Sequence, residues 1–364
     1  MKAPQIVSRH RTTVEIFAFF AYSRLLILLV GWLSTYVVPK AEWYGNPQSI
    51  VDLFFRWDSG WYLSIVQNGY SYVPGQQSSV AFFPLYPLLV KVFSFALVDA
   101  RITGIMLSNV ALLFAIICLF KIIQLDYENI KIPQNSVVFA LIFPTSFFLS
   151  IFYSESLFLL LSVACFYHAR KRRWLVSSML GYFTALTRTL GVLISIPILI
   201  EYLAPTSLRD IKFHRIKKDA FYLLFIPVGL LTYMSYLYIV FQEPLAFLKA
   251  QSVWGRGFSP FSALAGIFSY GPFYATIFGG FTVLSFSVLV YLIYSKVRLS
   301  YVVYAFIQLF FVFSSKLIES LPRYLCVLFP IYLGFALMAK NRFEVRTIKL
   351  FSISLLTLFV ILFT

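Results

Sequence analysis

The stretch 136–203 decides the fold of this chain: SVVFALIFPTSFFLSIFYSESLFLLLSVACFYHARKRRWLVSSMLGYFTALTRTLGVLISIPILIEYL. It contains two apolar runs, 136–169 and 174–203, separated by a basic segment. A transmembrane helix needs about 20 apolar residues, so each run is too long for one ordinary crossing and too short for two full ones. The run lengths therefore favour two short helical hairpins over two single spans.

Polar residues interrupt each run near its middle, at Tyr153-Ser154-Glu155-Ser156 and at Thr187-Arg188-Thr189. Lys171-Arg172-Arg173 and the basic segment 209–218 flank the second run on both sides. By the positive-inside rule both flanks are cytoplasmic, which requires an even number of crossings between them. We therefore predict that Glu155 and Arg188 lie at hairpin tips on the outer face.

The whole chain has the composition of a membrane protein. Of its 364 residues, 60% are hydrophobic and 12% are charged, and the mean hydropathy is +0.84, which excludes a soluble globular domain and a disordered chain. We predict an all-α polytopic protein with about eleven transmembrane helices in one domain, 1–364. The predicted spans are 14–38 (an uncleaved first span), 102–123, 136–151, 154–169, 174–187, 190–203, 220–241, 273–294, 299–315, 322–339 and 349–364.

Topology also accounts for the net charge of +16, so this charge does not indicate a nucleic-acid partner. With the N-terminus inside, 20 lysines and arginines fall on inner segments, 9 fall on outer segments, and Arg24 lies within the first span, where a charge needs a partner or a lipid phosphate. This arrangement leaves 81–98 as a helix at the outer interface, within an outer loop of about 39–101. Cys118, Cys165 and Cys326 lie in apolar stretches and are predicted to be packing residues.

The aromatic-rich part of the outer loop, 55–87, contains one carboxylate, Asp58. The aromatic residues could simply form an interfacial belt, with Asp58 as a helix cap, and the arginines at span ends could extend to lipid headgroups. A belt does not explain why acids and bases gather on one face. Our hypothesis is that Asp58, Glu155, Arg188 and Arg323 converge there into one polar site.

Several kinds of chemistry are disfavoured by what the sequence lacks. The three histidines, His10, His168 and His214, fall on or near inner segments, and no nucleotide-binding fingerprint or Asp-x-Asp pair is present. A carboxylate with nearby arginines suits transfer from a lipid phosphate: the leaving phosphate needs cations, and the acceptor hydroxyl needs one base. Aromatic rings suit the sugar and the isoprenoid chain.

At these residues the chain resembles the PIG-V family, the GPI mannosyltransferase 2 type, among the GT-C membrane glycosyltransferases. The resemblance runs from about Phe55 to Pro330. The matching motifs are Arg56-Trp57-Asp58-Ser59-Gly60-Trp61-Tyr62, Asn68-Gly69-Tyr70, Phe82-Phe83-Pro84-Leu85-Tyr86-Pro87, Phe143-Pro144-Thr145, Tyr153-Ser154-Glu155-Ser156-Leu157-Phe158, Thr187-Arg188-Thr189-Leu190-Gly191 and Ser320 with Arg323-Tyr324.

The resemblance implies a GT-C fold and inverting transfer of mannose from a polyprenyl or dolichyl phosphate mannose donor to a lipid or glycan acceptor. It implies that Asp58 is the general base. The leaving phosphate calls for an arginine, and Arg323 and Arg188 are alternatives for this phosphate-binding role that the sequence does not rank. The predicted substrate-binding residues are Arg56, Trp57, Trp61, Tyr62, Tyr70, Tyr86, Glu155 and Tyr324. Many GT-C enzymes have a paired acidic motif at the second outer tip, but only Glu155 stands there. No cofactor is certain, and a divalent metal is left open without a paired acidic motif to support it.

Three alternatives stay open at the level of sequence. The chain could transport or flip lipid-linked sugars, use another polyprenyl-phosphate sugar, or be a noncatalytic subunit of a glycosylation assembly. A transporter would return the lipid-linked sugar intact, whereas a transferase would release polyprenyl phosphate. We expect a cell-membrane protein with its site outward, or a luminal site in the endoplasmic reticulum if the organism is a eukaryote.

Overall fold

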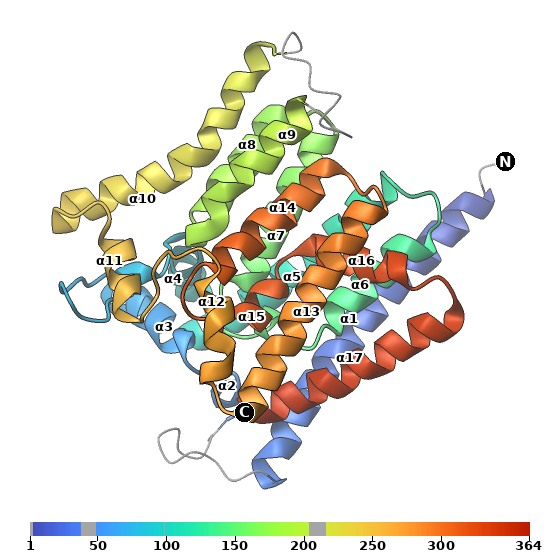
Figure 1. The fold of residues 1–364 in the computed structure, drawn as a ribbon, viewed down its shortest axis with the longest axis horizontal. Coiled ribbons are helices and arrows are strands. Elements are labelled where there is room, and N and C mark those ends of the chain that lie inside the picture. The colour runs from blue at the N-terminus through green and yellow to red at the C-terminus, as the bar shows by residue number, and fades with distance from the viewer. Residues whose placement is uncertain (1–2, 38–48, 98, 204–215) are drawn as a thin grey trace.

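A computed structural model describes residues 3–37, 49–97, 99–203 and 216–364, and all regular structure within them is helical (Figure 1). Within these ranges, five helical stretches are long and apolar enough to cross a membrane, and each matches a predicted span. The chain is therefore an all-helical membrane protein. These stretches are Val14–Val37 of α1 (Ala3–Val37), α5 (Ala100–Gln124), η7 (Lys218–Leu224) with α10 (Phe225–Phe241), α13 (Pro272–Tyr294) and α17 (Arg342–Phe363).

The other predicted spans also contain helices, but shorter ones, so the count of eleven crossings stays a prediction. Three of these are strongly apolar: η4 (Thr189–Ile194) with α9 (Ser195–Leu203), α14 (Leu299–Phe313) and α16 (Phe329–Met338). A fourth short apolar stretch, Leu85–Ala96 of α4 (Leu85–Leu97), lies in 81–98, which is predicted as an interfacial helix and not as a span. The remaining helices are α2 (Ile50–Leu53), α3 (Asp58–Asn68), η2 (Ser79–Ala81), α6 (Lys131–Leu141), η3 (Ser146–Leu149), α7 (Glu155–Arg170), α8 (Trp174–Ala185), α11 (Ala246–Val253), α12 (Ser262–Ala265), η8 (Gly266–Ser269) and α15 (Leu321–Leu325).

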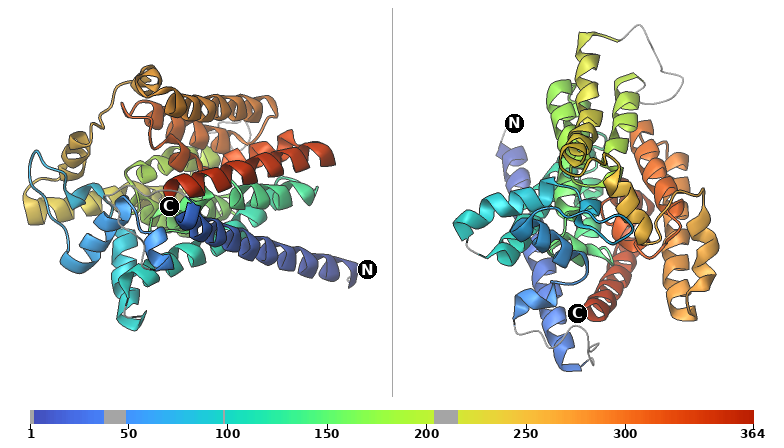
Figure 2. Two further views of the ribbon diagram at one scale, coloured as in Figure 1. Left: turned by 90° about the horizontal axis from the view of Figure 1, so that it is seen from below. Right: turned by 90° about the vertical axis from the view of Figure 1, so that its left-hand side faces the viewer.

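Helix α7 lies at the centre of the bundle. It packs against α5 and α8, while α8 packs on α10 and α6 packs on α16. Helices α1 and α17 also contact each other, and their ends meet where the Ser34 hydroxyl lies 2.5 Å from the Thr364 hydroxyl (Figures 1 and 2). The apolar side chains of these helices form one large core that runs through the molecule.

The first hairpin of the sequence prediction contains an irregular segment rather than a simple turn. Helix α6 ends at Leu141, η3 follows, and α7 begins only at Glu155. Pro144 lies in this segment, where it cannot donate a backbone hydrogen bond. Two backbone carbonyl oxygens of this region accept hydrogen bonds from buried Arg24 instead of from a helix. Its guanidinium donates to the carbonyl oxygens of Leu141 at 2.7 Å and Ser146 at 3.2 Å. The partner of Arg24 is therefore the broken helix itself.

The two ends of α7 carry opposite charges that match the helix dipole, with Glu155 in the first turn and Arg170 in the last. At the Arg170 end, Asp126 lies 2.6 Å from the Arg170 guanidinium, and Glu201 lies 3.4 Å from it. Arg298, which precedes α14, also pairs with Glu201 at 3.4 Å. These ion pairs fasten the ends of α5, α7, α9 and α14 together on the face opposite Glu155.

Some predictions fall outside the described residues. These are the first part of the outer loop, 39–48, and residues 209–215 of the basic segment 209–218, which includes His214. The second predicted hairpin, by contrast, is described in full, with α8 before Arg188 and η4 with α9 after it.

Candidate active site

A small cavity of about 120 Å³ lies at the end of α7 that begins with Glu155. Segments far apart in the sequence meet around it: the start of α3, the segment before α4, the turn between α8 and η4, the end of α11 and the short helix α15. The lining residues are Asp58, Tyr62, Ala81, Phe82, Phe83, Glu155, Thr187, Arg188, Thr189, Leu190, Gln251, Trp254, Arg256, Arg323 and Tyr324.

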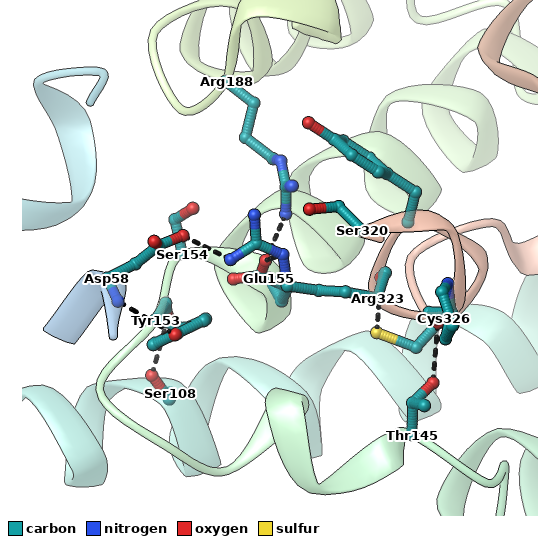
Figure 3. A network of polar contacts seen from close by, with 12 residues as sticks. Asp58, Ser108, Thr145, Tyr153, Ser154, Glu155, Arg188, Ser320, Arg323 and Cys326 are labelled. Atoms are coloured by element: carbon teal, nitrogen blue, oxygen red, sulfur yellow. Dashed lines mark hydrogen bonds and ion pairs between the residues drawn. The ribbon is translucent and has the colours of Figure 1, made fainter. Parts of the chain in front are cut away.

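Four of these residues form a continuous chain of ion pairs (Figure 3). The Arg323 guanidinium pairs with the Asp58 carboxylate and also lies 3.5 Å from Glu155 Oε1. The same Glu155 oxygen lies 2.6 Å from the guanidinium of Arg188. The structure thus brings Asp58, Glu155, Arg188 and Arg323 together, as the hypothesis of convergence requires.

The burial of this chain of ion pairs is uneven. The Glu155 side chain is 2% exposed, whereas that of Asp58 is 29% exposed. Burial is the largest single effect on Arg188 and lowers its pKa, but Glu155, Tyr324 and Tyr62 together outweigh burial and raise that pKa, so the guanidinium stays charged. Glu155 is therefore a buried counter-ion, and Asp58 is the carboxylate that reaches the open side of the cavity.

Backbone geometry at the start of α3 positions Asp58. Trp57, the residue before it, has a φ of 44°, an uncommon value for a residue with a side chain. The backbone N–H of Asp58 donates to the Tyr153 hydroxyl at 3.1 Å, and that hydroxyl donates to the Arg56 carbonyl oxygen at 3.2 Å. Tyr153, which is fully buried, therefore holds both sides of the turn that presents Asp58.

A third arginine, Arg256, completes the polar side of the cavity, although it is not among the site residues predicted from the sequence. Its guanidinium donates to the Ser320 hydroxyl at 2.7 Å and to the Tyr324 hydroxyl at 3.1 Å. Arg256 is thus the cavity arginine whose partners here are neutral hydroxyl groups.

These charged groups do not cancel. The three arginines face two carboxylates, so the site has a net charge of +1 while Tyr324 is protonated. The Tyr62 hydroxyl lies 2.9 Å from the Ser154 hydroxyl at the bottom of the cavity, and Phe82, Phe83 and Trp254 form the apolar wall. The cavity therefore combines positive charge, one accessible carboxylate and aromatic surface.

The other predicted substrate-binding residues lie away from the cavity wall. The Arg56 guanidinium donates to the Thr364 carbonyl oxygen at 3.2 Å, and Trp57 packs on Phe148 and Phe363. The remaining three are aromatic side chains with packing contacts: Trp61 stacks on Phe82 and contacts Trp254, Tyr70 donates to the Phe82 carbonyl oxygen, and Tyr86 is buried and donates to the Gly104 carbonyl oxygen. These five support the site rather than line it.

The residues present do not fit a divalent cation. The Arg323 guanidinium contacts both Asp58 and Glu155, so a positive charge already lies between the two acids. Within the described ranges, no group of three or more His, Cys, Asp and Glu side chains is arranged to hold a metal ion.

The fold is of the GT-C type. The structure is similar to the crystal structure of the Archaeoglobus fulgidus oligosaccharyltransferase in its apo form, with a TM-score of 0.54 and 11% identity over 95% of this chain and 56% of that chain. The crystal structure of the same protein tethered through a disulfide bond to an acceptor peptide with the NVT sequon gives a TM-score of 0.50 and 12% identity, over 93% of this chain and 55% of that one.

Residues 46–247, more than half of the chain, match the family described as Mannosyltransferase (PIG-V), and the chain belongs to this family. It is similar to the GPI mannosyltransferase 2 of Drosophila melanogaster, with 29% identity over 37% of this chain and 35% of that protein. The GPI mannosyltransferase 2 of Drosophila pseudoobscura pseudoobscura is 28% identical over 37% of this chain and 36% of its own length. The match thus spans about a third of the length of these relatives.

Proposed function

We propose that this protein is an inverting mannosyltransferase that moves mannose from a polyprenyl or dolichyl phosphate mannose to a lipid or surface glycan acceptor. The observation that carries the proposal is the cavity in which Asp58 faces three arginines. Membership of the mannosyltransferase family supports the sugar, and the likeness to an oligosaccharyltransferase supports a glycosyltransferase fold.

Asp58 is the proposed general base. In the reaction, the acceptor hydroxyl gives its proton to Asp58 while its oxygen forms a bond to the anomeric carbon of the sugar. The bond from that carbon to the phosphate oxygen breaks on the opposite side, and polyprenyl phosphate leaves with the electron pair. The partial exposure of Asp58 supports this role, because a base must reach the proton it accepts.

The arginines stabilise the charge that develops on the leaving phosphate. Arg323 and Arg188 are shared with carboxylates, so a phosphate competes with Asp58 and Glu155 for them. Arg256 contacts only the neutral hydroxyls of Ser320 and Tyr324 among the groups that line this side, so it meets a phosphate without losing an ion pair. We therefore assign the first contact with the donor phosphate to Arg256.

The site faces the outer side of the membrane in this proposal: the cell exterior in a prokaryote, or the lumen of the endoplasmic reticulum in a eukaryote. The basic segment Lys171-Arg172-Arg173 follows the far end of α7 and supports this orientation by the positive-inside rule. A cavity at a helix end near the interface lets lipid substrates enter from the side.

The test is a transfer assay in liposomes with radiolabelled polyprenyl-phosphate mannose and host lipid extract. We expect labelled product with the wild type and a loss of about a hundredfold or more with Asp58→Asn, the usual range for a general base. Asp52→Asn is the matched control, because Asp52 lies in the same outer segment but pairs with Arg101, outside the cavity. Undiminished transfer by Asp58→Asn excludes the base assignment.

The same liposomes distinguish a transferase from a transporter, because the net positive cavity would also suit the phosphate of a lipid-linked sugar in transit. A transferase releases polyprenyl phosphate in step with product. A transporter moves the intact donor across the bilayer in both variants, and this result would replace the proposed function.

A further inference from the structure

A second cavity, of about 810 Å³, lies among three helix ends on the face opposite the candidate active site. The first turns of α6 and α17 and the end of α16 surround it, on the right-hand side of Figure 1. The last turn of α7 lies on this face, because α7 begins at the active site and runs away from it. The first turn of α17 lies on the same face, because α17 ends next to Thr364, which contacts Arg56 near the start of α3. We call it the basic cavity.

Five positively charged side chains line the basic cavity: Lys131, Lys340, Arg342, Arg346 and Lys349. No carboxylate lines it, and none of the five forms an ion pair with an acid in the part of the chain that the structure describes. The amides of Asn129, Asn135 and Asn341 add further hydrogen-bond donors. The cavity thus has a charge of +5 with no internal counter-ion.

Three of these charges lie on the side of α17 that lines the basic cavity. Arg342, Arg346 and Lys349 are four and three residues apart, so they share one side of α17. The acid nearest to them in sequence, Glu344, is used elsewhere, because it accepts the backbone N–H groups of Lys340 at 2.6 Å and Asn341 at 3.3 Å in the helix cap. The positive charge is therefore left for a ligand.

We propose that the basic cavity binds the phosphate headgroup of an anionic phospholipid, a site separate from the one used for transfer. Basic cavities between transmembrane helices on the cytoplasmic side bind anionic lipid headgroups, because the membrane holds these headgroups at that depth. The apolar lining of Ile132, Ala336, Val345 and Leu350 suits the glycerol and the first carbons of the acyl chains. A soluble phosphate would contact the cations but gain nothing from this apolar surface.

The first experiment is native mass spectrometry of the full chain, purified in detergent with equal amounts of phosphatidylglycerol and phosphatidylcholine. We expect the wild type to retain one molecule of phosphatidylglycerol in preference to phosphatidylcholine. Each basic residue at an anionic lipid surface changes affinity by about fivefold, so Arg342→Gln/Arg346→Gln should weaken retention about thirtyfold. Lys217→Gln/Lys218→Gln is the matched control, because it removes two exposed charges outside the cavity and should bind as the wild type does.

If the Arg342→Gln/Arg346→Gln protein does not purify as one species, Lys131→Gln/Lys340→Gln takes its place, since both of these side chains are exposed. Equal retention of the two lipids by the wild type, or equal losses in the cavity and control variants, overturns the proposal. A second arm adds glycerol phosphate and inorganic phosphate. Displacement of the lipid by either at millimolar concentration would show a site for a soluble anion and would overturn the lipid assignment.

Discussion

Substitution of Glu155 by glutamine should destabilise the protein strongly, although glutamine has nearly the same size and shape. Glu155 is 2% exposed and neutralises Arg188 at 2.6 Å, while Arg323 keeps Asp58 as a second partner. Without Glu155, the Arg188 charge is buried and uncompensated. Removing one partner of a buried ion pair costs about 3–5 kcal/mol, so we expect Glu155→Gln to lower the free energy of unfolding by that amount.

The assay is equilibrium unfolding in mixed micelles, with tryptophan fluorescence as the signal. Arg188→Met and the double variant Glu155→Gln/Arg188→Met complete a double-mutant cycle. Because the double variant removes both charges, its loss should be smaller than the sum of the single losses by about 1–3 kcal/mol.

The matched control is the exposed pair Asp52 and Arg101, which lie 3.2 Å apart with side chains 31% and 41% exposed. Asp52→Asn should change the free energy of unfolding by less than about 1 kcal/mol. A loss for Glu155→Gln no larger than this control, or strict additivity of the two single losses at Glu155 and Arg188, would refute the reasoning.

Two further predictions concern turnover. Arg256→Gln should raise the KM for the donor about tenfold or more, with partial recovery in Arg256→Lys, because the phosphate loses a charged donor; steady-state kinetics with varied donor checks this. Gly191→Ala would place a Cβ 2.2 Å from the Thr184 carbonyl oxygen, shift the adjoining turn and lower kcat about a hundredfold, whereas Gly279→Ala, with nothing within 4 Å, should leave kcat unchanged.

The helical membrane fold could be predicted from the sequence because its signals are local. The long apolar runs gave spans such as 102–123 and 273–294 within a few residues of α5 and α13. The placement of Glu155 and Arg188 at neighbouring tips followed from charged flanks and run lengths, and the two side chains lie in contact. These predictions needed only hydropathy, charge and the thickness of a bilayer.

Other parts of the site depended on contacts that leave no local pattern. Arg256 lies in a segment without strong periodicity and reaches the cavity only because α15 brings Ser320 and Tyr324 to it. The partners of Arg24 are backbone carbonyl oxygens, which every residue has, so no sequence signal marks them. The sequence also does not show in which direction an aromatic side chain points. Tyr86, which was predicted to bind substrate because it lies in a matching motif, is buried in the core.

The net charge of +1 in the cavity has a consequence for the order of events in a catalytic cycle. A phosphodiester donor carries one negative charge and makes the filled site neutral. In the proposed reaction, the proton that Asp58 accepts raises the protein charge to +2, which balances a phosphate monoester with two negative charges. When Asp58 then loses this proton to water, the occupied site acquires a net negative charge. Deprotonation of Asp58 would thus restore the general base and, through charge repulsion, favour release of polyprenyl phosphate. Product release and recovery of the base are therefore coupled.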